Sequence, residues 1–194
     1  SSGMITGSIG AVSAGVSMVR PRLDQQADDE GQVTILFSDI VGYTAMTDRL
    51  GDQRTHDVLR THNDVLRAAL ARHRGIEVKS EGDGFMLAFR APHDALAFAR
   101  EFREQLATIV WPADVGEVCV RMGVHCGQVI RDSDDFFGRT VIIGARIAAS
   151  AGAREVLVTD EVRAAVGDAF RFGESRELTL KGLRLPHRAS MLEG

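Results

Sequence analysis

The sequence predicts an α+β fold, namely a ferredoxin-like βαββαβ core sheet with its helices on one face and additional C-terminal α and β elements. Short runs rich in β-forming residues alternate with longer stretches in which apolar residues recur at helical spacing. An Asp-Gly dipeptide joins two adjacent strand-like runs, which indicates a hairpin and therefore an antiparallel pair. Together these observations favour one domain built around a single sheet.

The size and composition agree with one globular domain. The chain has 194 residues, of which 44% are hydrophobic and 26% charged, so it can bury a substantial core. The formal net charge of −4 argues against nucleic-acid binding, which usually requires a basic face. The sequence contains no run of ~20 apolar residues that could span a membrane. We expect no signal peptide, because no basic start is followed by a continuous apolar core.

The chain has two cysteines, Cys119 and Cys126. Two cysteines form neither a disulfide framework nor a metal site of their own. An odd number of positions separates them in one strand-like run, so they are expected to point to opposite faces. We interpret them as reduced core thiols of a cytoplasmic protein.

The beginning of the chain differs in composition from the rest. Residues 1–19 are rich in Ser, Gly and Ala, and residues 20–30 are charged and polar. We therefore expect residues 1–30 to form a flexible leader, either a cloning remnant or a linker. Residues 31–194 are expected to form the domain.

The stretch VTILFSDIVGYT, residues 33–44, organises the prediction. Its apolar, β-forming part indicates a buried strand that ends at Asp39. Gly42 permits a tight turn into a following helix. An acid at this position can hold a hard cation against a phosphate, or it can simply cap the helix. The stretch by itself does not separate these two interpretations.

The later elements follow in order from apolar spacing and from the Gly and Pro positions. A helical stripe runs from Asp52 to Arg74 and stops at Gly75, and a second helix opens at Pro92 and reaches Ile109. The predicted strands occupy residues 76–80, 85–90, 117–125, 129–131, 155–158 and 178–180, with a last strand after Pro186. The remaining predicted helices occupy residues 139–151 and 160–166.

The predicted hairpin brings a second acid to the first strand. Asp83 lies in the turn EGDG, and in a βαββ arrangement this hairpin neighbours the strand that ends at Asp39. Two carboxylates together with phosphate oxygens form a suitable cage for Mg²⁺ or Mn²⁺. Considered alone, Asp83 is more often an ordinary turn residue.

Six segments, in order, resemble the catalytic domain of class III nucleotidyl cyclases, in particular the bacterial homodimeric adenylyl cyclases. FSDIVGYT contains the first acid, and KSEGDGFM contains the second, 44 positions later. The other four segments are RMGVHCG (121–127), DFFG (135–138), TVIIGAR (140–146) and LTLKG (178–182). The matches span the chain from residue 33 to about residue 190.

This resemblance implies roles for the acids and the following loop. Asp39 and Asp83 would hold two divalent cations, Mg²⁺ or Mn²⁺, with the carbonyl oxygen of Ile40 as an additional ligand. The backbone of Ile40, Val41, Gly42, Tyr43 and Thr44 would cradle the β- and γ-phosphates of the substrate.

The resemblance also implies how the base is selected. Lys79 occupies the purine-contacting position, where guanylyl cyclases usually have Glu. Asp135 matches the second base-reading position, with Asp134 as a rival in register. A lysine donating to adenine N1 and an aspartate accepting from N6 favour adenine over guanine. Without the motif, Lys79 would be interpreted as a solvated strand residue.

Two basic residues complete the implied site. Arg146 matches the arginine that stabilises charge on the α-phosphate while the ribose 3′-oxygen attacks. Lys181 resembles the lysine that neutralises the triphosphate tail. The structural alternative for Arg146 is an ordinary arginine on a helix surface.

One position departs from the family pattern. The family usually has Asn four residues before the catalytic arginine, and this chain has Ile142. A missing preorganised donor commonly costs about 2.7–4 kcal/mol, or about 10²–10³ in rate. Thr140, Arg139 or a water molecule are the candidates to replace it; without a replacement, turnover is expected to be slow.

The resemblance predicts an adenylyl cyclase that converts ATP into 3′,5′-cyclic AMP and pyrophosphate. The family arrangement implies a head-to-tail homodimer in which one subunit supplies the metal acids and the other supplies the base-reading pair and the basic residues. The alternative, motivated by Ile142, is a low-activity or inactive nucleotide-binding module with a regulatory role. A diguanylate cyclase is disfavoured because the chain lacks a GGDEF-type hairpin.

Overall fold

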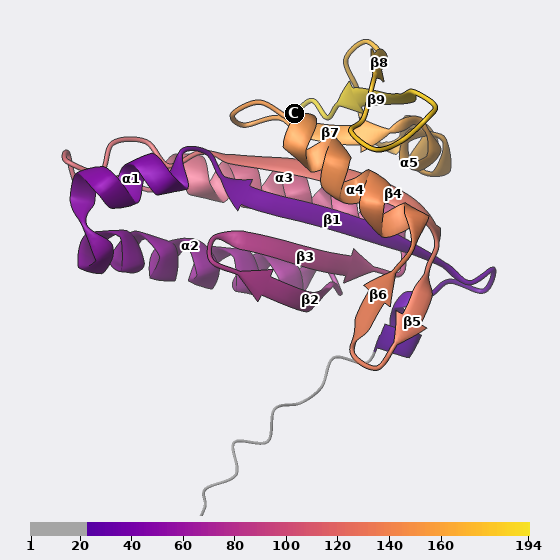
Figure 1. The fold of residues 1–194 in the computed structure, drawn as a ribbon, viewed down its shortest axis with the longest axis horizontal. Coiled ribbons are helices and arrows are strands. Elements are labelled where there is room, and N and C mark those ends of the chain that lie inside the picture. The colour runs from indigo at the N-terminus through magenta and orange to yellow at the C-terminus, as the bar shows by residue number, and fades with distance from the viewer. Residues whose placement is uncertain (1–22) are drawn as a thin grey trace, which may run out of the picture.

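The structure, a computed structural model, describes residues 23–194, and it places a seven-stranded sheet at the centre of the molecule (Figure 1). The strand order is β2-β3-β1-β4-β7-β9-β8. Neighbouring strands are antiparallel except for β4 and β7, which run parallel. A separate two-stranded hairpin, β5-β6, follows β4. The antiparallel-leaning α+β sheet expected from the sequence is confirmed.

The strands are β1 (Gln32–Ile40), β2 (Ile76–Glu81), β3 (Gly84–Phe89), β4 (Val120–Gln128), β5 (Ile130–Asp132), β6 (Asp135–Phe137), β7 (Val156–Thr159), β8 (Arg176–Leu178) and β9 (His187–Met191). The α-helices are α1 (Tyr43–Leu50), α2 (Asp52–Arg72), α3 (Pro92–Thr108), α4 (Arg139–Ser150) and α5 (Asp160–Val166). Two short 3₁₀ helices are η1 (Leu23–Gln26) and η2 (Gly167–Ala169).

The helices are divided between the two faces of the sheet. The apolar faces of α2, α3 and α5 pack with Leu36, Leu87 and Val124 in the largest buried cluster. The core helices therefore share one face, as the βαββαβ plan predicts. Helix α4, one of the C-terminal additions, crosses the opposite face in front of β1 and β4 (Figure 1).

Small residues allow α4 to lie close to the sheet. A Cβ placed on Gly123 of β4 would come within 2.2 Å of the backbone N of Ala148 on α4. On the helix side, a Cβ on Gly144 would lie 3.4 Å from the ring of Phe37 on β1. A larger side chain at Gly123 would displace the helix, because packed interiors have no spare volume. The pair fixes the height of α4, and therefore of Arg146, above the sheet.

Most element boundaries agree with the sequence-based expectations to within a few residues. The strand expected at residues 117–125 is observed three residues later, at Val120–Gln128. A second difference lies at the C-terminal end, where the strand expected at residues 178–180 is observed two residues earlier, at Arg176–Leu178. The reason is that Leu180 is buried against α4, in a cluster that includes Ile143, and so it does not continue the β8 ladder. Apolar spacing marks both leucines as buried but does not separate these two kinds of burial.

The two cysteines are both free thiols. Cys126 lies on β4 in the main core, where burial raises the pKa of its thiol to about 11. Cys119 precedes β4 and is partly exposed, so only Cys126 is a core thiol as expected.

The predicted leader, residues 1–30, lies for most of its length outside the described residues. Its last part packs on the sheet. Leu23 is 3% exposed and clusters with Val33 and Met86, and Arg90 donates a hydrogen bond to the carbonyl oxygen of Ala27 at 2.6 Å. The packed domain thus includes residues from Leu23 onward. Within the described part of the chain, no helix has the length and apolar character that crossing a membrane requires.

A buried histidine makes the stability of the fold depend on pH. His125 on β4 is 5% exposed, and its Nδ1 lies 2.8 Å from the Thr159 hydroxyl. Burial lowers the pKa of His125 from 6.5 to about 4. The unfolded chain therefore binds a proton at a higher pH than the folded chain does. The resulting stability is complete above pH 6.5 and declines as the pH falls toward 4.

At pH 5 this difference amounts to about 2 kcal/mol in the free energy of unfolding. We expect urea unfolding to show that the free energy of unfolding falls between pH 7 and pH 5 in the wild type. In His125→Gln this decrease is expected to be smaller by about 2 kcal/mol. The other buried imidazole with a lowered pKa, His62, is present in both proteins and cancels in the comparison. An equal loss in the two proteins would contradict the assignment to His125.

Candidate active site

Strand β1 carries the first predicted acid next to its last residue, and an arginine on the neighbouring strand β4 holds that acid. Asp39 lies directly opposite Arg121 in the antiparallel pairing of β1 with β4. The Nε and Nη2 atoms of Arg121 donate to the two carboxylate oxygens of Asp39 at 2.7 and 3.1 Å. This hydrogen-bonded ion pair raises the pKa of Arg121 above its ordinary value. Both side chains remain about one-third exposed.

The hairpin brings the second acid to the same place. Gly82, with φ of 57°, and Asp83 form the turn between β2 and β3, and β3 pairs with β1. Asp83 Oδ2 accepts a hydrogen bond of 2.8 Å from the backbone N–H of Ile40, the residue after Asp39. The prediction that the hairpin neighbours the first strand is confirmed, and the two carboxylates face one cavity.

That cavity has a volume of about 590 Å³ and extends over the start of α1. Its lining comprises residues 39–45, Asp83, Arg121 and residues 151–153. Gly42 adopts φ of 71°, a left-handed conformation that turns the chain from β1 into α1. A phosphate chain is a suitable occupant, because the first N–H groups of a helix have no partner inside it.

Fewer backbone N–H groups are available to a phosphate than the sequence predicts. Two of the five backbone N–H groups in the predicted phosphate cradle already have partners, since Ile40 N–H donates to Asp83 and Val41 N–H donates to the carbonyl oxygen of Cys119 at 2.8 Å. The first helical bond is donated by Met46 to Gly42. The N–H groups available to a ligand are therefore those nearer the start of α1, where Tyr43, Thr44 and Ala45 lie in the cavity wall.

A second cavity, of about 460 Å³, adjoins the first at Asp39. Its walls come from β1, β2, β3 and α4, and they include Lys79, Met86 and Ala149. Lys79, the predicted base-reading lysine, lies on β2 beside the hairpin that contains Asp83. The two cavities together run from the start of α1 to this lysine, so Lys79 lies near the first acid of its own chain, whereas the resemblance assigns the base-reading pair to the other subunit.

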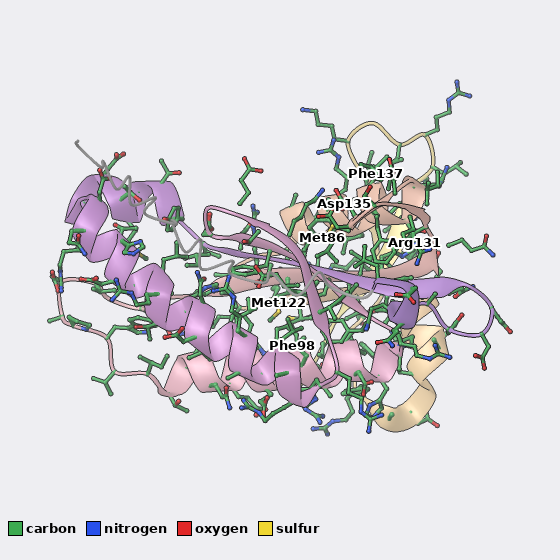
Figure 2. All side chains as sticks on the ribbon, turned by 90° about the horizontal axis from the view of Figure 1, so that it is seen from below. Met86, Phe98, Met122, Arg131, Asp135 and Phe137 are labelled. Carbon is green, nitrogen blue, oxygen red and sulfur yellow. The ribbon has the colours of Figure 1, made fainter. Side chains whose placement is uncertain are left out.

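The structure pairs the two predicted base-reading residues. Lys79 Nζ lies 2.8 Å from Asp135 Oδ2 and 5.9 Å from the centre of the Phe137 ring. Asp134 is exposed in the β5-β6 turn, so of the two candidate aspartates Asp135 is the one that pairs with Lys79. Figure 2 shows Asp135 and Phe137 together on this hairpin, on the same side of the sheet as Met86 and away from Phe98.

Asp39 and Asp83 are suited to a hard divalent cation but cannot enclose one by themselves. Within residues 23–194, no three His, Cys, Asp or Glu side chains gather closely enough to form a metal site. Mg²⁺ and Mn²⁺ accept this situation, because they commonly bind one or two carboxylates and complete their coordination with phosphate oxygens and water. The donor set therefore fits a cation that arrives with a phosphorylated ligand.

The remaining predicted site residues lie away from the two acids of their own chain. Arg146 is exposed on α4 and Lys181 is exposed after β8, and neither belongs to the lining of the two cavities at Asp39. Ile142 is 48% exposed, one helical turn before Arg146. Thr140 is not a substitute for the missing Asn, because its hydroxyl is buried and donates to the carbonyl oxygen of Gln128 at 2.6 Å. Arg139 remains exposed.

Arg121 is a charged residue of the site whose role the sequence did not indicate. It opens the segment RMGVHCG, and only the β1-β4 register places it opposite Asp39. Its signal in the sequence is a basic residue at the start of a strand, facing an acid at the end of another. Opposite charges favour such cross-strand pairs.

The fold and site define a class: an α+β sheet domain in which an acid at the end of β1 and an acid in the β2-β3 turn lie beside a helix start that is open to an anion. Residues 25–193 match the family described as the adenylate and guanylate cyclase catalytic domain. The chain belongs to this family, as the sequence resemblance indicates.

Among curated relatives, the chain is 32% identical over 166 residues to an adenylate cyclase of Mycosarcoma maydis, covering 73% of this chain and 7% of that protein. It is 30% identical over 132 residues to a putative adenylate cyclase 3 of Rhizobium meliloti, covering 66% of this chain and 22% of that protein. The chain thus spans only a small part of the length of these relatives.

Two solved structures illustrate the common fold. An adenylate cyclase of Trypanosoma brucei in its monomeric state superimposes with a TM-score of 0.78 at 22% identity, over 84% of this chain and 88% of that chain. The catalytic core of a rhodopsin-guanylyl cyclase with converted specificity, in complex with ATPαS, gives 0.77 at 21% identity, over 84% and 96%. These similarities establish the fold.

Proposed function

We propose that the domain is an adenylyl cyclase, which forms 3′,5′-cyclic AMP and pyrophosphate from ATP by in-line attack of the ribose 3′-oxygen on the α-phosphate. The observation that carries the proposal is the convergence of Asp39 and Asp83 on one cavity at the start of α1. Family membership and the adenylate cyclases among the curated relatives support the same reaction. The whole protein's input and output signals lie outside this proposal.

At the phosphate end, the chain contributes fixed charge and backbone donors. The N–H groups at the start of α1 are positioned for the β- and γ-phosphates, and the helix dipole favours negative charge there. Asp39 and Asp83 would hold the two divalent cations, Mg²⁺ or Mn²⁺, with the Ile40 carbonyl oxygen as a further ligand. Cations bound there would lower the cost of negative charge on the attacking oxygen and on the departing pyrophosphate.

At the base end, Lys79 and Asp135 form one charged pair that presents both a donor and an acceptor. This combination complements adenine, which accepts at N1 and donates from N6. Guanine presents the opposite polarity on that edge and would leave both groups unsatisfied, which is costly in a partly dry pocket. The proposed base preference is therefore adenine.

The active form is proposed to be a head-to-tail homodimer with two shared sites. The support is geometric: in one chain, Arg146 and Lys181 lie outside the cavities at Asp39, and both are exposed. A second copy can bring its own Arg146 and Lys181 to these acids, and a two-fold arrangement creates two equal sites. The free thiols Cys119 and Cys126 support a reducing compartment such as the cytoplasm.

The direct test is product formation by the purified protein with Mn²⁺ and either ATP or GTP at several protein concentrations. We expect cyclic AMP from ATP, much less cyclic GMP from GTP, and a specific activity that rises with protein concentration. Cyclic AMP at or below the level of an Asp39→Ala control would overturn the proposal.

Restoring the family's polar residue at position 142 is expected to increase turnover. The Thr140 hydroxyl already donates to the carbonyl oxygen of Gln128, so it does not replace the missing donor at Ile142. Asn has the shape and the hydrogen-bonding groups needed to orient the ribose or Arg146. We expect Ile142→Asn to raise kcat by about tenfold or more, up to the 10²–10³ that such donors commonly contribute.

The measurement is the initial rate at saturating Mn-ATP, with Ile142→Leu as the matched control. Leucine keeps the apolar surface and is expected to leave the rate unchanged. Equal rates for the asparagine and leucine variants would show that another group already fills this role.

A further inference from the structure

The ion pair between Arg121 and Asp39 has a consequence for cation binding. Both carboxylate oxygens of Asp39 accept hydrogen bonds from the guanidinium, at 2.7 and 3.1 Å. A bidentate, charge-assisted pair of this kind is among the stronger polar contacts in proteins. In this state the positive guanidinium already neutralises the Asp39 carboxylate that would attract a cation. Each of the two carboxylate oxygens also has one of its coordination directions occupied by a hydrogen bond.

The guanidinium is also anchored on its other side. Nη1 of Arg121 donates to the carbonyl oxygen of Ala149 at 3.1 Å, on the last turn of α4. The arginine is therefore held between the end of β1 and the end of α4. A cation that binds Asp39 has to compete with this held group, because the anchor keeps it within reach of the carboxylate.

The same guanidinium lines the cavity over the start of α1. A polyphosphate in that cavity offers Arg121 alternative oxygen acceptors of higher negative charge, in a geometry that a guanidinium matches well. Exchange of carboxylate for phosphate leaves Asp39 free for a cation and keeps Arg121 paired. A polyphosphate that binds Arg121 therefore frees Asp39 for a cation, and a cation that binds Asp39 frees Arg121 for a polyphosphate.

We propose that Arg121 competes with the divalent cation for Asp39, so that the free protein binds the cation weakly and takes it up together with a polyphosphate. This inference rests on the proposed function only in treating Asp39 as a cation ligand. It assigns Arg121 the role of a positioning residue, which acts through the Asp39 carboxylate. Its effect is a coupling free energy between two ligands, and such coupling is reciprocal.

The test is a titration of Mn²⁺ alone, without nucleotide, with the unbound ion measured by electron paramagnetic resonance. We expect Arg121→Met to bind Mn²⁺ about tenfold more tightly than the wild type, as the loss of a bidentate pair predicts. Arg188→Met removes an arginine charge from β9, where Arg188 pairs with Glu177, and is expected to leave the affinity unchanged.

Removal of a positive charge can also raise cation affinity without any direct competition, and a double-mutant cycle separates the two causes. In an Asp39→Asn background, Arg121→Met is expected to give no gain, because the carboxylate that it would release is absent. A gain that persists in this background would overturn the proposal, as would equal affinities of the wild type and Arg121→Met.

Circular dichroism and thermal unfolding establish that each variant is folded. If Arg121→Met does not fold, Arg121→Lys decides, because lysine keeps the charge but cannot form two parallel hydrogen bonds. It is expected to raise Mn²⁺ affinity by about threefold, and an unchanged affinity would overturn the proposal.

Cyclic AMP formation without these affinity changes defeats this inference alone, whereas the affinity changes without cyclic AMP defeat the proposed reaction alone. Absence of Mn²⁺ binding in every variant defeats the cation site itself.

Discussion

Replacement of Asp39 with asparagine is expected to lower cyclic AMP formation by about a thousandfold, which corresponds to about 4 kcal/mol in the activation free energy. Asparagine preserves the shape of the side chain but removes the charge at the point where β1 meets the phosphate cavity. The remaining acid, Asp83, is already bonded to the Ile40 N–H and would have to hold a cation alone. The measurement is kcat with saturating Mn-ATP.

The matched control for this prediction is Asp168→Asn, which removes the same charge from an exposed residue of η2. It is expected to retain full activity. Retention of more than about a tenth of the rate by Asp39→Asn would show that the carboxylate is not essential to charge stabilisation in the reaction.

Replacement of Arg146 with alanine is expected to lower kcat by about 10²–10³, with a much smaller effect on KM. The proposed role of Arg146 is to stabilise charge that develops on the α-phosphate only during the reaction, and such interactions affect kcat more than ground-state binding. The residue is exposed on α4, so removal of its side chain leaves the packing of the helix unchanged. Steady-state kinetics with Mn-ATP provide the measurement.

Arg60→Ala serves as the control, because Arg60 is likewise an exposed arginine on a helix but lies on α2, across the sheet. Its kinetics are expected to match the wild type. Were Arg146→Ala to raise KM alone, Arg146 would be a binding residue rather than a catalytic one.

Much of the fold and the placement of the two acids followed from local sequence signals. Asp39 terminates a run of β-forming residues, and Gly42 permits the left-handed turn that leads into α1. The Asp-Gly dipeptide marked the β2-β3 hairpin, and its tip lies at the end of β1 because β1 and β3 pair. These features depend on short-range chemistry, which single sequences record well.

Contacts between distant segments were not predictable in the same way. The Arg121–Asp39 pair joins residues 82 positions apart and depends on a β1-β4 register that a shift of one residue would destroy. The N–H of Val41 is bonded to Cys119, and the Thr140 hydroxyl to Gln128, which removed one predicted phosphate donor and one predicted substitute for Asn. Whether a donor group is free can be decided only when its hydrogen-bond partner in the folded chain is known.

The most direct measurement of the central claim is recovery of activity when two inactive variants are mixed. Asp39→Asn loses the acid half of each shared site and Arg146→Ala loses the arginine half, so a mixed dimer contains one intact site. At equal concentrations we expect roughly a quarter of the wild-type cyclic AMP formation, from random pairing of the subunits. No recovery at any ratio, with both variants folded and dimeric, would contradict a site shared between two chains.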